Sequence, residues 1–324
     1  MPAPEPTSLP LRRRLLRILR DLRVSLMLAG LTLLPSAASA QPATIITAEP
    51  AGAAGRAPAL ADTHIIHVPG IAGPLRIDRH LAEGLLAGGA ASEVEIFDWV
   101  GRRRGFKALF GVDENHRQAR RLALHILQLR QIHPDRRLVI TAHSGGTAIA
   151  AWALEMLPAL IEEQKGKQGG EADDSLPMVD GVILMAAGLS PEYDLSPMLR
   201  QVRGRVFHLS SKADNLILGA GTLVLGTLDR KFAVAAGKTG FYLPPGVEPA
   251  AYATFVEVPY DATWAELGHY GEHEGMMTTP FGASVISDLV RAALGESVPL
   301  PTTRPASPAP ADAPTTAPAT QPAQ

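Results

Sequence analysis

Cysteine is absent from this 324-residue chain. The absence excludes a cysteine nucleophile, thiolate metal sites and disulfide bonds, so the fold depends on its core for stability. An excess of charge of one sign is lacking too, since the formal net charge is −2 at pH 7. Proteins dedicated to nucleic acids carry a strongly basic surface. We therefore expect no nucleic-acid partner.

The first 40 residues have the composition of an export signal. A run of arginines over 12–23 precedes a short apolar stretch at 24–34, and Ala38-Ser39-Ala40 has the small-x-small pattern of a cleavage site. The apolar stretch is short for a membrane span. The sequence thus predicts a cleaved signal peptide over 1–40 and an exported, periplasmic or secreted protein. An uncleaved N-terminal anchor, with association at the envelope or membrane surface, is the alternative; the export route and the oligomeric state stay open.

Two other segments lack the apolar periodicity that a core needs. Residues 41–60 are rich in Ala, Gly and Pro and are interpreted as a flexible leader, whereas 298–324 consist almost entirely of Pro, Ala, Thr, Ser and Gln. Such a composition predicts a disordered tail. Residues 61–297 remain as one domain-sized piece.

Apolar runs and helical patterns alternate within that domain. Six short apolar runs are predicted as strands: Thr63–Val68, Glu93–Trp99, Arg137–Ala142, Gly181–Ala187, Gly204–Ser210 and Thr254–Val258. Apolar residues at three-and-four spacing predict helices over Leu75–Leu86, Asn115–Ile132, Thr147–Leu160 and Gly282–Leu294. The alternation indicates an α/β fold with a doubly wound, mostly parallel sheet flanked by helices, a three-layer sandwich.

Ser144 stands where a strand changes abruptly into a helix. The stretch 137–142 is apolar, His143-Ser144-Gly145-Gly146 breaks it, and a helical pattern follows. This is the outline of a nucleophile elbow, whose usual pattern is Gly-x-Ser-x-Gly. Gly146 fills the second glycine position, and Ala142 replaces the first.

A serine nucleophile needs a base, and the base needs a group that orients it. Asp214 follows the predicted strand 204–210 and is our candidate acid. In the segment before the last helix, His273 is the favoured base because it lies nearer that helix; His269 is the alternative. The two histidines are not a convincing metal pair, because Gly271 interrupts the helix that such a pair requires. We expect neither a metal nor a cofactor.

The oxyanion of an acyl-transfer intermediate needs two backbone N–H donors. Gly145, directly after the candidate nucleophile, would supply one. The loop after the first domain strand, Pro69-Gly70-Ile71, would supply the other from Ile71.

The elbow, this loop and the chain order Ser144, Asp214, His273 resemble the α/β-hydrolase superfamily, in particular its lipase- and esterase-like members, over roughly residues 63–294. The resemblance implies that Ser144 is the nucleophile, His273 the base and then acid, and Asp214 its orienter. Ile71 and Gly145 would form the oxyanion hole.

The leading hypothesis is an exported serine hydrolase that cleaves an ester, a lipid or an acylated small molecule, through an acyl-enzyme. An acyltransferase or a serine peptidase would use the same residues. A non-catalytic binding protein on this scaffold is the alternative from another class. The segment 215–267 is longer than a simple crossover and is interpreted as a possible lid or wall.

Overall fold

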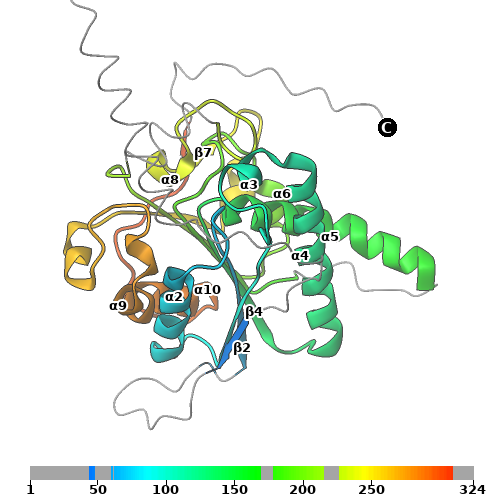
Figure 1. Ribbon diagram of the computed structural model, residues 1–324, viewed down its shortest axis with the longest axis horizontal. Coiled ribbons are helices and arrows are strands. Elements are labelled where there is room, and N and C mark those ends of the chain that lie inside the picture. Colours follow the sequence, from blue (N-terminus) through cyan, green and yellow to red (C-terminus); the bar gives the residue numbers. More distant parts are fainter. Residues whose placement is uncertain (1–43, 48–59, 61, 169–177, 215–225, 309–324) are drawn as a thin grey trace, which may run out of the picture. The chain divides into compact units, whose positions relative to one another are not determined.

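The computed structural model describes residues 44–47, 60, 62–168, 178–214 and 226–308 (Figure 1). The chain divides into the units Met1–Gln41 and Pro42–Gln324, and every described residue lies in the second. The predicted signal peptide lies outside the described residues. Within the described ranges, no helix is long and apolar enough to cross a membrane.

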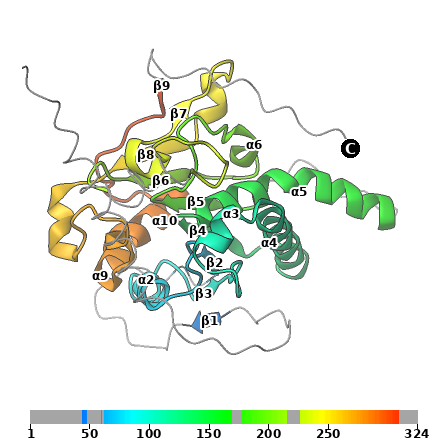
Figure 2. The ribbon, with the colours of Figure 1, turned by 45° about the horizontal axis from the view of Figure 1, so that its top comes forward.

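A seven-stranded sheet forms the centre of the described unit, in the order β1-β3-β2-β4-β5-β6-β8 (Figure 2). Its strands are β1 (Thr44–Thr47), β2 (Thr63–Val68), β3 (Glu93–Ile96), β4 (Arg137–His143), β5 (Gly181–Met185), β6 (Val206–Ser210) and β8 (Phe255–Pro259). β1 pairs with β3 antiparallel, and all the other pairs are parallel. The predicted α/β class and mostly parallel sheet are confirmed.

Helices cover both faces of the sheet (Figures 1 and 2). The longer elements are α2 (Arg76–Ala87), α4 (Val112–Ile132), α5 (Gly146–Gln168) and α10 (Ser287–Ala293). α4 and α5 pack into one apolar cluster and α2 and α10 into another, one on each face of the sheet. This arrangement is the predicted three-layer sandwich. The inner strands β2, β5 and β6 are buried along their whole length, which is why they are nearly continuous apolar runs in the sequence.

Short elements complete the unit. They are α3 (Phe106–Phe110), α6 (Ser196–Leu199), α8 (Ala236–Thr239), β7 (Tyr242–Leu243), η2 (Pro249–Tyr252), η3 (Ala262–Leu267), η4 (Gly275–Met277), α9 (Thr279–Phe281), η5 (Gly282–Ile286) and β9 (Ser307–Pro308). β3 ends earlier than predicted because the Asp98 carboxylate accepts the N–H groups of Val100 and Gly101, which turns the chain.

Parts of the predicted leader and tail are structured. Residues 44–47 form β1, and Arg304 exchanges two backbone hydrogen bonds with Glu257 of β8, at 2.8 and 2.9 Å. Val298 and Leu300 pack against the apolar core. The boundary at 297 is therefore wrong for residues 298–308, because backbone pairing and apolar contacts hold them. Residues 48–59 and 309–324 lie outside the described residues.

The segment interpreted as a possible lid or wall is built into the domain over 226–267. Leu228, Phe241 and Tyr252 belong to the apolar core, and the segment includes β8 of the central sheet. Along this range the chain is therefore part of the domain's core and sheet. Residues 215–225 lie outside the described residues.

Two carboxyl groups in the described unit have strongly shifted pKa values. Burial raises the pKa of Glu95, but hydrogen bonds from His125 and His64, at 2.9 and 3.1 Å, outweigh it and hold the pKa at about 2. Burial raises the pKa of Glu155 on α5 to about 7, although the Tyr193 hydroxyl donates to it at 2.8 Å. Glu95 is thus a buried carboxylate that hydrogen bonds keep ionised, whereas folding favours the protonated form of Glu155.

Candidate active site

Ser144 occupies a strained turn between β4 and α5. Its φ is +53°, in the left-handed region that non-glycine residues seldom adopt. Neighbouring backbone holds it there: the Ser144 N–H donates to the Met185 carbonyl at 2.9 Å, and the Gly188 N–H donates to the Ser144 carbonyl at 3.1 Å. Strain of this kind persists only where the surroundings impose it, and it is a recognised feature of functional sites.

The tight turn depends on Gly146. A Cβ at this position would lie 2.2 Å from the Val68 carbonyl oxygen and 2.4 Å from that of Pro69, closer than atoms approach. Ala142, where the usual pattern has glycine, is completely buried in β4 and lies in register with Val68 and Leu184. Its methyl group is accommodated in the sheet, so the departure from the usual pattern does not distort the turn.

Ser144, His273 and Asp214 are joined by two hydrogen bonds. The His273 Nδ1–H donates to the Asp214 carboxylate at 2.6 Å, because a carboxylate can only accept. That leaves Nε2 as an acceptor, and the Ser144 hydroxyl donates to it at 2.9 Å. The three residues are 59 and 129 positions apart in the chain. The fold brings the three sequence-predicted residues together.

The turn that carries Asp214 is tied to the loop that carries His273. The Ser211 hydroxyl donates to the Gly271 carbonyl at 2.6 Å, and the Asp214 N–H donates to the Ser211 carbonyl at 3.1 Å. Gly271 has φ +92°, and a Cβ there would lie 2.8 Å from the Ala213 Cβ. Glycine therefore allows the two segments to approach closely.

His269, the alternative base, lies elsewhere in the same loop. It is completely buried, and its ring centroid is 4.9 Å from that of Tyr260, 5.8 Å from Trp264 and 5.1 Å from Phe281. Burial lowers its pKa to about 4, although nearby carboxylates oppose the shift. Among the described hydrogen bonds, none joins it to the candidate nucleophile or acid. Its contacts give it a structural role in shaping the loop.

The two predicted oxyanion donors lie side by side. Ile71 lies in the turn closed by a 3.0 Å hydrogen bond from the Gly73 N–H to the Gly70 carbonyl. Its backbone nitrogen is 3.6 Å from the position that a Cβ on Gly145 would take. In the part of the chain that the structure describes, neither the Ile71 nor the Gly145 N–H has an acceptor. Two unpaired donors beside the serine are what an oxyanion requires.

We call residues 69–73 the oxyanion loop. Two contacts that sequence reasoning missed hold it in place. The indole Nε1–H of Trp99 donates to the Pro69 carbonyl at 2.7 Å, and the Gly105 N–H donates to the Ile71 carbonyl at 2.8 Å. Trp99 was recognisable only as the last apolar residue of a predicted strand. Nothing in its neighbourhood in the sequence indicates the contact.

The histidine of the elbow also contacts the site. His143 is 4% exposed, and its Nε2 lies 3.0 Å from the backbone oxygen of His273. Burial lowers its pKa to about 3. Its place before Ser144 is the only signal of this contact in the sequence.

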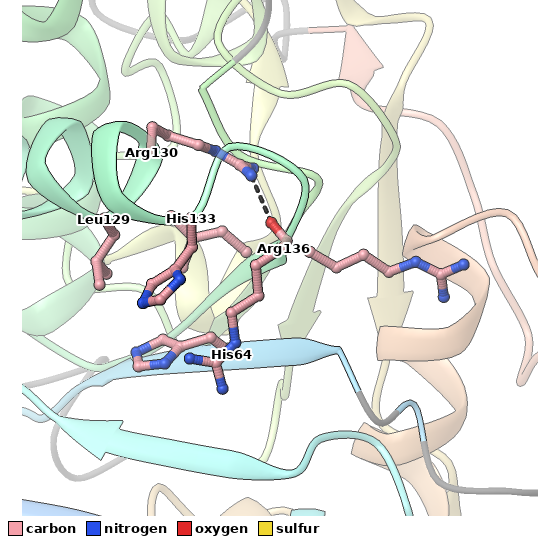
Figure 3. A pocket seen from close by; sticks show the side chains of 7 residues that line it. His64, Leu129, Arg130, His133 and Arg136 are labelled. Carbon is pink, nitrogen blue, oxygen red and sulfur yellow. Dashed lines mark hydrogen bonds between the residues drawn. The ribbon is translucent and has the colours of Figure 1, made fainter.

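A cavity of about 10 Å³, the room of one water molecule, lies at the opposite end of β4 (Figure 3). Its lining residues are His64, Leu129, Arg130, His133, Arg136, Arg137 and Leu138. The guanidinium of Arg130 is engaged there by the Arg136 carbonyl and the Asp180 carboxylate. This cavity is too small for a substrate. Among the described residues, no cluster of three or more metal-binding side chains is found.

No protein-family model and no curated protein matches this chain. Among solved structures, it is similar to a putative esterase from Staphylococcus aureus, at 9% identity over 86% of this chain and 92% of that one, with a TM-score of 0.40. An α/β serine hydrolase without a lid from Xanthomonas campestris matches at 14% identity, 79% and 90% coverage and a TM-score of 0.37. Lipase B from Aspergillus fumigatus matches at 14% identity with a TM-score of 0.39; the match covers 70% of this chain and about half, 52%, of the lipase.

Such low similarity does not transfer an activity, and the fold rests on the chain's own geometry. The parallel strands around β4, the left-handed serine at the strand-to-helix turn and the chain order serine, aspartate, histidine belong together in one known architecture. This protein has the α/β-hydrolase fold.

Proposed function

We propose that this protein is an exported serine hydrolase that cleaves a carboxylic ester, of a lipid or of an acylated small molecule. The observation that carries the proposal is the hydrogen-bonded chain from the Ser144 hydroxyl through His273 to Asp214, at 2.9 and 2.6 Å. In this order the imidazole can accept the serine proton while the carboxylate stabilises the imidazolium that forms. Export is proposed from the composition of residues 1–40.

The proposed reaction has two halves. The Ser144 oxygen attacks the ester carbonyl carbon as its proton passes to His273 Nε2, and the carbonyl oxygen becomes an oxyanion held by the Ile71 and Gly145 N–H groups. The C–O bond to the alcohol then breaks, and the alcohol leaves with the proton from His273. Water attacks the acyl-enzyme in the same way, releasing the acid and restoring the serine.

A fluorophosphonate probe tests this function directly, because it reacts only with an activated serine. We expect the purified protein to be labelled at Ser144, as located by peptide mass. Labelling should disappear in Ser144→Ala and persist in Ser92→Ala, a serine at the other end of the sheet. His273→Ala should abolish labelling, whereas His269→Ala in folded protein should retain it.

Well-folded protein that is not labelled would contradict the hydrolase and favour a binding scaffold. If labelling succeeds, esters of graded acyl length should be hydrolysed, and loss of turnover in Asp214→Asn should be about 10⁴-fold. Transfer of the acyl group to added alcohols or amines in preference to water would identify an acyltransferase instead.

A further inference from the structure

His143 is a buried polar residue beside the site to which the proposed reaction gives no role. It is the last residue of β4 and lies between two loops. On one side its Nε2 is 3.0 Å from the His273 carbonyl oxygen. On the other side its Nδ1 is 3.6 Å from where a Cβ on Gly70 would lie. One imidazole thus faces both the loop of the proposed base and the oxyanion loop.

The hydrogen bond to the His273 carbonyl determines the tautomer of His143. A carbonyl oxygen can only accept, so the proton of the neutral ring is on Nε2. His273 is consequently held at two points: its side chain by Asp214 and its backbone by His143. The bond joins residues 130 positions apart.

The charge of His143 matters as well. Burial is the main cause that lowers its pKa to about 3, and the proximity of the imidazoles of His273 and of His67 on β2 acts in the same direction. Asp78 on α2 and the His273 carbonyl oppose the shift. His143 is therefore uncharged between pH 5 and 8. Its ring centroid is only 4.8 Å from that of His273, so a cation here would disfavour the imidazolium that the proposed reaction forms.

We propose that His143 is a positioning residue, which donates its Nε2–H to the backbone carbonyl of His273 and thereby holds the base in hydrogen-bonding distance of Ser144. The inference rests on the proposed function, since it gives His143 a part in the same reaction. A displacement of about 1 Å in a catalytic group can reduce the rate about 100-fold.

Two substitutions separate the hydrogen bond from the bulk of the ring. His143→Phe fills the space without a donor, whereas His143→Gln retains an N–H donor. His116→Phe is the matched control, because this half-buried histidine stacks on Trp152, with ring centroids 4.4 Å apart, and no described hydrogen bond joins it to Ser144 or His273. We expect the Phe variant at 143 to lose 10- to 100-fold in kcat and in the rate of phosphonylation, with KM within about twofold. The Gln variant should recover most of that loss, and the control should match the wild type.

A measurement without turnover keeps the inference separate from the function. In ¹⁵N-histidine NMR spectra of the full protein, His143 should stay in the neutral Nε2–H form from pH 5 to 8. At a single fixed pH, the ring ¹⁵N signals of His273 should move in His143→Phe, which loses the hydrogen bond to the His273 carbonyl, but not in His116→Phe. This result would stand even if the wild type failed to react with the probe, which would contradict the proposed function alone.

Three results would overturn the inference. One is a folded His143→Phe protein with the wild-type rate and unchanged ring ¹⁵N signals of His273. Another is a Gln variant no better than the Phe variant. The third is a His143 that titrates between pH 5 and 8 or carries its proton on Nδ1. If the Phe variant does not fold, the rate of the Gln variant and the His143 tautomer in the wild-type spectra still test the inference.

Discussion

Replacing Trp99 by phenylalanine removes one hydrogen bond from the oxyanion loop and little else. Trp99 is 1% exposed, and its indole N–H donates to the Pro69 carbonyl at 2.7 Å. Phenylalanine keeps a six-membered ring in the core but has no donor. The Pro69 carbonyl would lose its hydrogen-bond partner, and the missing ring atoms would leave a small void.

The size of the effect follows from these two losses. A buried acceptor left without a partner costs about 1–3 kcal/mol. The void adds about 1 kcal/mol, at the low end for the loss of a few buried atoms. We therefore expect the free energy of unfolding to fall by about 2–4 kcal/mol. Losing an oxyanion donor outright reduces kcat by about 10²–10³, so a loosened Ile71 should reduce it by about 10- to 100-fold with KM nearly unchanged.

The assay compares the three tryptophans of the chain. Trp152→Phe and Trp264→Phe are matched controls, since both side chains are buried, at 5% and 6% exposure, and neither has a described hydrogen bond to the oxyanion loop. Urea unfolding measures stability, and ester hydrolysis gives kcat and KM. If Trp99→Phe lowered kcat no more than the two controls at equal loss of stability, the indole would not be positioning the loop.

Three other changes give distinct outcomes. Burial raises the pKa of Glu155 to about 7 in the folded protein, so its contribution to the free energy of unfolding is largest below pH 4.5 and is lost as pH rises through 7. The Glu155→Gln side chain can still accept from Tyr193, and this variant should gain up to about 3 kcal/mol in the free energy of unfolding relative to wild type between pH 5 and 8. Urea unfolding measures the gain, and equal pH profiles for the two proteins would refute it. Folding lowers the pKa of Glu95 to about 2, so its contribution to the free energy of unfolding is present above pH 4.5 and is lost as pH falls through 2. Glu95→Gln should therefore remove about 3 kcal/mol of the pH dependence of unfolding between pH 5 and 2. An acid transition that is the same in the variant and the wild type would contradict this prediction. Gly146→Ala would place a methyl group 2.2 Å from the Val68 carbonyl and should prevent probe labelling, with destabilisation of at least about 1–3 kcal/mol; a stable, labelled protein would show that the turn has room.

The strands and long helices were predictable because their signals are local. Thr63–Val68 was predicted with the bounds of β2, since a strand buried on both faces is a continuous apolar run. β1 was not predicted, because four residues in an Ala- and Gly-rich segment form a strand only through pairing with β3. Arg304 is similar: its contacts with β8 come from 47 positions away in the chain and leave no periodic pattern.

The candidate site divides in the same way. Ser144 was found from the local change of strand to helix, and Asp214 from its place after a strand. The preference for His273 over His269 rested only on its position nearer the last helix, because the two histidines lie four residues apart among similar neighbours. What separates them is the aromatic surroundings of His269, formed by residues of η3 and α9 and by Tyr260. Such surroundings exist only after the chain has folded.

The backbone pairing of Arg304 with Glu257 has a consequence for how the protein stays unaggregated. β8 is the last strand of the sheet, and an uncovered outer strand offers its free N–H and carbonyl groups to other chains. The segment 298–308 pairs with part of this edge strand, whereas the opposite edge of the sheet ends in the short strand β1. A shortened protein spanning 61–297 would lose both coverings at once. It would keep Ser144, His273 and Asp214, yet both edges of its sheet would be exposed. Edge strands of different molecules could then pair and aggregate.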